Sequence, residues 1–129
     1  MKMKRILSEQ VIGCAFEVSN TLGAGFLESV YENALCEEMV RHGLQFQRQK
    51  SLQVKYKGKV VGNYIADVVV EDKLLLELKA LSKLSGEHEA QLMNYLKASG
   101  LSVGLLFNFG VPKLSFKRLV WQYNTTERI

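Results

Sequence analysis

Hydrophobic residues recur every three or four positions in three stretches of the chain, which is the spacing of one helix face. The first stretch covers about residues 8–22, and the second covers residues 27–39, with Gly43 as its C-terminal stop. The third follows Ser85, a typical N-cap residue that precedes acidic side chains, and it ends at Gly100. We therefore predict three helices.

The other apolar segments are short, rich in leucine or β-branched residues, and bounded by charged or turn residues, which favours strands. They lie at about residues 44–57, 60–70, 73–80, 103–109 and 114–121. The element order is then α-α-β-β-β-α-β-β. Because the third helix can form a right-handed crossover between parallel strands, we predict a mixed α/β (α+β) fold with a mixed central sheet flanked by helices.

Composition is consistent with one compact domain over residues 1–129, since 47% of the residues are hydrophobic and only one is proline. No apolar run approaches the roughly 18 residues of a membrane span, and the N-terminus has no signal-peptide core. We therefore expect a cytoplasmic protein that does not enter a membrane. Cys14 and Cys36 form no CxxC pair and fall in predicted helices, so we expect free, buried thiols.

The net charge of +4 originates entirely after residue 50. Residues 1–50 carry six basic and six acidic side chains, whereas residues 51–129 carry eleven basic and seven acidic ones. Lys55, Lys57 and Lys59 alternate around the predicted hairpin turn. Such a basic surface suits a polyanionic partner, although a solvated strand face with solubilising lysines would have the same composition.

Three ionisable residues stand out on the second and third predicted strands: Asp67, Glu77 and Lys79. Because side chains alternate along a strand, Glu77 and Lys79 share one face, and the three groups converge if Asp67 faces the same way. Two carboxylates suit a hard cation such as Mg²⁺, and a neighbouring lysine can orient water or stabilise developing negative charge. A solvated face or a cross-strand ion pair is the ordinary alternative.

The segment Gly25-Phe26-Leu27-Glu28-Ser29-Val30-Tyr31 resembles the signature of the small bacterial and archaeal proteins named GxxExxY after this motif. These proteins are grouped with the PD-(D/E)XK nuclease superfamily. The pattern Asp67…Glu77-x-Lys79 follows in the correct order, and Gln91-x-x-x-Tyr95 resembles a motif on the helix after the catalytic strands in the exonuclease branch. The resemblance covers about residues 6–119 and implies a restriction-endonuclease-like core of order α-β-β-β-α-β.

Carried over to this sequence, the resemblance implies that Asp67 and Glu77 bind Mg²⁺ or Mn²⁺ and that Lys79 assists the attacking water. It also implies that Glu28 completes the acidic site as a further metal ligand, and that Gln91 positions Lys79 or the substrate. Ala66 replaces the proline of the PD name, which supplies no ligand.

The resemblance thus predicts a metal-dependent nuclease that hydrolyses phosphodiester bonds of DNA. One alternative is a catalytically silent nucleic-acid-binding or protein-binding module of the same fold. A second alternative is a purely structural ion-pair network between Glu77 and Lys79. Because so small a domain has little surface to enclose a duplex, we also expect assembly into a homodimer or a larger complex.

Overall fold

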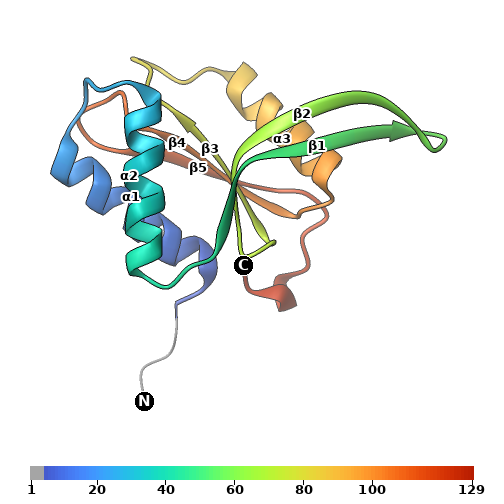
Figure 1. The fold of residues 1–129 in the computed structure, drawn as a ribbon, viewed down its shortest axis with the longest axis horizontal. Helices are drawn as coiled ribbons and strands as arrows, with labels where there is room; N and C mark the ends of the chain where they lie inside the picture. The colour runs from blue at the N-terminus through green and yellow to red at the C-terminus, as the bar shows by residue number, and fades with distance from the viewer. Residues whose placement is uncertain (1–4) are drawn as a thin grey trace.

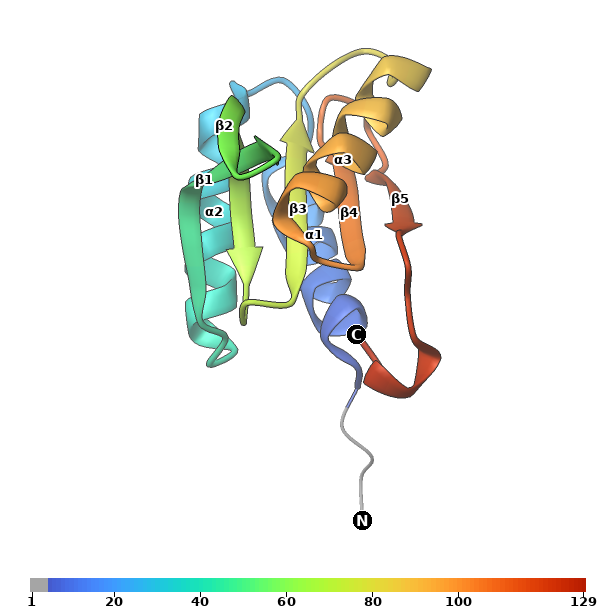
Figure 2. The ribbon, with the colours of Figure 1, turned by 90° about the vertical axis from the view of Figure 1, so that its right-hand side faces the viewer.

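A computed structural model describes residues 5–129 and shows a central sheet covered by helices on both faces (Figures 1 and 2). The helices α1 and α2 pack on one face of the sheet, and α3 packs on the other. Their bounds are Leu7–Leu22, Glu28–Arg41 and Gly86–Ser99. The three helices predicted from hydrophobic spacing are therefore confirmed.

The sheet has five strands in the order β1-β2-β3-β4-β5. Neighbouring strands are antiparallel except β3 and β4, which are parallel and joined through α3. The predicted mixed α/β fold and the order α-α-β-β-β-α-β-β are confirmed, and a short 3₁₀ helix after β5 was not predicted. The strands and this helix span Phe46–Tyr56, Lys59–Val70, Leu74–Lys79, Val103–Asn108, Ser115–Val120 and Thr125–Glu127.

Two hydrophobic cores lie on opposite faces of the sheet, and β3 contributes to both. Leu76 and Leu78 pack with α1 and α2, whereas Leu75 packs with α3. Strands buried on both faces are apolar throughout, which explains the unbroken leucine run at the start of β3. Glu77 falls on the α3 side of this strand and is only 3% exposed.

The β1–β2 hairpin twists sharply at Gln49 and Asp67. Val68 packs into the α1/α2 core while Ala66 packs into the α3 core, although residues two apart in a regular strand share a face. The pairs on either side of Gln49 and Asp67 are formed, but these two residues are not themselves paired, and Gln49 has a φ of 50°. Beyond the twist the hairpin projects past the rest of the sheet (Figure 1).

Cys14 and Cys36 are both buried and unpaired, as the sequence predicts. No helix within residues 5–129 has the length and apolar character needed to cross a lipid bilayer.

Candidate functional site

Asp67 and Glu77 lie opposite each other where the pairing of β2 with β3 ends. The backbones pair at three positions, the last of which joins Val68 to Leu76. Beyond that point the side-chain carboxylates, instead of backbone carbonyls, accept hydrogen bonds from the backbone amides. The Asp67 amide donates to Glu77 Oε1 at 3.0 Å, and the Leu78 amide donates to Asp67 Oδ2 at 2.8 Å. The expected convergence of the two carboxylates is thus present in the structure.

Burial makes this pair of carboxylates unusually difficult to ionise. Burial first, and then repulsion from Asp67, raise the pKa of Glu77 to about 8. Burial also raises the pKa of Asp67, although the bond from the Leu78 amide opposes that shift. Neither carboxylate forms an ion pair with a cationic side chain within residues 5–129. A proton or a bound cation is needed to offset the cost of burying two adjacent negative charges.

The donor set of this pair fits a hard divalent cation, which prefers carboxylate oxygens and retains several waters. Two carboxylates alone do not enclose an ion. In the part of the chain that the structure describes, no cluster of three His, Cys, Asp or Glu side chains is placed to hold one. Water and phosphate oxygens would have to complete the coordination of a metal bound by Asp67 and Glu77.

Lys79 follows Glu77 by two residues and lies on the same face of β3. Its positive charge opposes the rise in the pKa of Glu77, Asp67 and Glu28, so its ammonium group is near enough to act on all three carboxylates. It nevertheless forms no ion pair within residues 5–129. The Glu77–Lys79 ion pair required by the structural alternative is therefore not formed, and Lys79 is left available for another partner.

Asn108 fixes the chain directly after Lys79, and sequence reasoning missed it. Its buried side chain accepts a bond from the Leu81 amide at 2.9 Å and donates to the Leu81 carbonyl at 3.0 Å. Two residues on, a Cβ at Gly110 would lie 2.3 Å from the Leu81 backbone, so only glycine fits there. The available signal was an asparagine at the end of an apolar strand with a glycine two positions later.

The loop before α2 explains the Gly25-x-x-Glu28-x-x-Tyr31 spacing physically. Tyr31 is fully buried, and its hydroxyl donates to the Gly23 carbonyl at 2.6 Å and accepts from the Phe26 amide at 3.1 Å. Gly25 has a φ of 116°, which favours glycine. This loop delivers Glu28 to the first turn of α2, where its side chain is exposed to solvent.

Glu28 is electrostatically coupled to the carboxylate pair. Partial burial, followed by repulsion from Asp67, raises the pKa of Glu28, and Lys79 opposes that shift. The predicted acid from the helix before the sheet is therefore near enough for its charge to interact with the pair, although its side chain is exposed. Its role as a third metal ligand stays a prediction, because the described residues 5–129 form no cluster of three such ligands.

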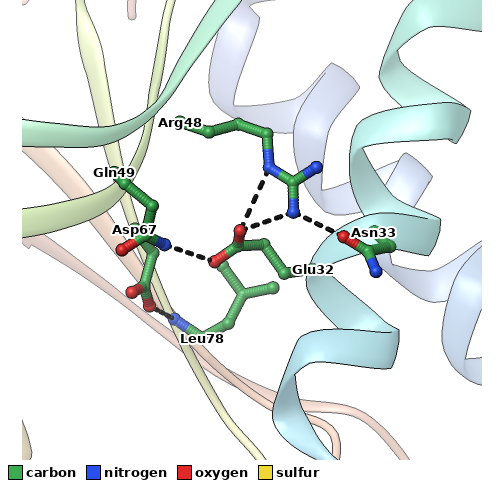
Figure 3. A network of polar contacts seen from close by, with 6 residues as sticks. All are labelled: Glu32, Asn33, Arg48, Gln49, Asp67 and Leu78. Carbon is green, nitrogen blue, oxygen red and sulfur yellow. Dashed lines mark hydrogen bonds and ion pairs between the residues drawn. The ribbon is translucent and has the colours of Figure 1, made fainter.

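Glu32, one turn after Glu28, anchors α2 to the twisted part of β1 (Figure 3). Its carboxylate accepts two bonds from Arg48, at 3.1 and 2.7 Å, and one from the Gln49 side chain at 3.0 Å. The network thus holds Gln49, which lies across from Asp67 at the twist. Its position four residues after Glu28 puts it on the same face of the helix, but the sequence alone gives it no role beyond that of an acid near the helix N-terminus.

Gln91 and Tyr95 border the carboxylates from α3. The Gln91 amide donates to the Tyr95 hydroxyl at 3.2 Å, and the Tyr95 ring lies 5.1 Å from that of Tyr64. Burial, then the negative charges of Glu77 and Asp67, raise the pKa of Tyr95. The hydrogen bond of Gln91 thus runs to Tyr95, and the expected effect of Gln91 on Lys79 or substrate stays a prediction.

The family profile of the PD-(D/E)XK nuclease superfamily matches residues 5–119 of this sequence. The chain belongs to that superfamily. The crystal structure of SSO0001 has a similar fold, with a TM-score of 0.59 and 16% sequence identity. The match covers 94% of this chain but only 60% of SSO0001. No curated protein matches the sequence, and the narrower GxxExxY resemblance stays a prediction.

In this PD-(D/E)XK protein, the defining acidic pattern reads Ala66-Asp67 on β2 and Glu77-Leu78-Lys79 on β3. Ala66 is fully buried and pairs with Lys50 in the sheet. A small residue with a backbone N–H suits this packed and paired position, whereas proline has no N–H to donate.

Proposed function

We propose that this PD-(D/E)XK protein is a metal-dependent nuclease that hydrolyses phosphodiester bonds of DNA. The observation that supports this most is the carboxylate pair of the buried Glu77 and the half-buried Asp67, with Lys79 beside it and no ion pair at any of the three within residues 5–129. Such an arrangement is unfavourable in an isolated protein and becomes favourable once a cation and a phosphate are bound.

The residues take the following roles in this proposal. Asp67 and Glu77, with Glu28 as a further ligand, hold one Mg²⁺ or Mn²⁺ ion. When bound, the ion supplies Lewis acidity toward the scissile phosphate and lowers the pKa of a coordinated water. Lys79 donates to the attacking water or to the phosphate oxygens, whose negative charge increases in the transition state. Gln91 orients the Tyr95 hydroxyl at the border of the site, where substrate passes.

Cleavage of labelled single-stranded and double-stranded DNA in Mg²⁺, Mn²⁺ or EDTA tests the proposal. We expect metal-dependent cutting by the wild type and a loss of about 10²-fold or more in Lys79→Ala, the scale of removing one group that stabilises transition-state charge. Lys83→Ala is the matched control, because it removes the same charge from a nearby exposed position. Equal cutting by the Lys79→Ala protein would contradict the assignment, provided circular dichroism shows both variants folded.

A silent binding module of the same fold is the second candidate, and the basic excess after residue 50 favours it as much as it favours a nuclease. Under this alternative the protein binds DNA but cuts no substrate with either metal. A cytoplasmic location and assembly into a homodimer are further expectations of both candidates.

A further inference from the structure

A crevice of about 330 Å³ lies between the β1–β2 hairpin and α3. It exists because the hairpin, beyond its twist, extends alongside α3 and past the rest of the sheet (Figure 1). Its lining includes Gln53, Lys55 and Tyr64 from the hairpin and Asn94 and Lys97 from α3.

Two contacting tyrosines link the crevice to the carboxylate site. Tyr64 lines the crevice, and its ring lies 5.1 Å from that of Tyr95. The Tyr95 phenol in turn is close enough to Glu77 and Asp67 for their charges to raise its pKa. The two rings therefore bridge the crevice and the carboxylate site.

The walls of the crevice offer two different kinds of contact. Lys55 and Lys97 bring positive charge, and neither forms an ion pair within residues 5–129. Tyr64 brings an aromatic ring that remains 39% exposed. Lysines that follow a phosphate backbone beside an exposed ring on which a base can stack are the usual means of holding single-stranded nucleic acid.

We propose that this crevice binds the single-stranded nucleotides next to the cleaved bond, with phosphates on Lys55 and Lys97 and a base against Tyr64. The position of these nucleotides beside a cleaved bond rests on the proposed nuclease function. Binding of single-stranded nucleic acid in the crevice does not depend on it. The β1–β2 hairpin contributes Asp67 to the carboxylate site. In this proposal it also holds the substrate.

Binding of a fluorescein-labelled single-stranded oligonucleotide, followed by anisotropy in EDTA across a salt series, tests the lysines. For Lys55→Gln/Lys97→Gln we expect weaker binding and a slope of log K against log salt that is smaller by about 1.4, or about 0.7 per phosphate contact. The matched control is Lys73→Gln/Lys113→Gln, which removes two exposed lysines remote from the crevice. An equal loss in both double variants, or no loss in either, would overturn the proposal.

Photo-crosslinking to an oligonucleotide that contains 5-iodouracil tests the aromatic contact. We expect the crosslink at Tyr64 and not at Tyr56, which lies at the hairpin tip and is more exposed, at 63%. A crosslink that follows exposure, with Tyr56 preferred, would contradict the proposal.

The two proposals fail in different ways. Cutting that depends on Lys79 but not on Lys55 and Lys97 would support the nuclease function and contradict the binding role of the crevice. Binding that depends on the crevice lysines, without cutting in any metal, would support the crevice as the binding surface of a silent module. It would contradict the nuclease function.

Discussion

At the scale of single residues, the carboxylates of Asp67 and Glu77 perform two tasks at once. Each accepts a backbone amide left without a strand partner where β2 and β3 separate. Each also presents oxygen atoms to the same spot, where burial disfavours their charge. Substitution at either position therefore alters both the hydrogen bond to the backbone and the electrostatics. Replacement by Asn or Gln separates the two effects, because the amide keeps an acceptor oxygen and removes the charge.

The first prediction concerns Glu77→Gln in metal-free buffer. The pKa of Glu77 is about 8 in the folded protein against an ordinary 4.5, so the folded state keeps a proton that the unfolded state releases. The stability from this group is complete below pH 4.5 and is lost as the pH rises to about 8. Gln does not titrate and can still accept the Asp67 amide. The free energy of unfolding of Glu77→Gln, relative to that of the wild type, should therefore increase as the pH rises from 4.5 to about 8.

Urea denaturation at a series of pH values with EDTA measures this difference. Glu87→Gln, an exposed substitution at the start of α3, is the control for removing one carboxylate. Stability curves for wild type and Glu77→Gln that stay parallel between pH 4.5 and 8 would show that Glu77 ionises normally.

At the scale of elements, the helices and strands followed from the sequence because each presents a clear period. The spacing of α2 has the period of a helix, and the short leucine run of β3 is assigned to a strand by its length and its charged flanks. The twist at Gln49 had no such signal, since a left-handed glutamine is not encoded by its residue type. Backbone strain of this kind is held by tertiary contacts, here the bond from Gln49 to Glu32.

The second prediction concerns the loop that sets α2 in place. Tyr31→Phe keeps the ring stacked on Phe109 but loses the hydroxyl that joins the Gly23 carbonyl to the Phe26 amide. We expect a loss of about 1 kcal/mol in the free energy of unfolding, because two part-buried hydrogen bonds to the loop backbone are lost. If Glu28 acts in catalysis, kcat for DNA cleavage should fall as well, since its helix start is released.

Glu28→Gln in the wild-type background is the companion to this variant. It should lower kcat without the loss of stability, because its exposed side chain makes no hydrogen bond within residues 5–129. A Tyr31→Phe protein that is as stable as the wild type in thermal and urea denaturation would contradict the role assigned to the hydroxyl.

At the scale of the whole molecule, the sequence predicted which residues meet at the site but not what supports them. Asp67, Glu77 and Lys79 could be brought together by strand alternation and one assumed hairpin register. The contacts of Asn108 and Arg48 could not be predicted, because each joins segments distant in sequence: Asn108 to Leu81, and Arg48 to Glu32. Long-range contacts leave no period for a single sequence to reveal.

The third prediction concerns the uneven charge of the molecule. A net charge of +4, concentrated after residue 50, attracts a polyanion, and salt weakens that attraction by screening and by reducing the gain from counterion release. If DNA is the substrate, kcat/KM should therefore fall steeply as salt rises, whereas kcat at saturating DNA should change little. The proposed chemical step at Asp67, Glu77 and Lys79 is screened less than the surface, because Glu77 is buried and the other two are half-buried.

Steady-state cleavage at several KCl concentrations, with free Mg²⁺ held constant, separates the two parameters. The control is Lys73→Gln/Lys113→Gln, which lowers net charge at positions remote from the crevice and should keep most of the salt slope. A fall confined to kcat would locate the salt effect at the carboxylates instead, because competition of K⁺ for a cation site acts on turnover rather than on encounter with DNA.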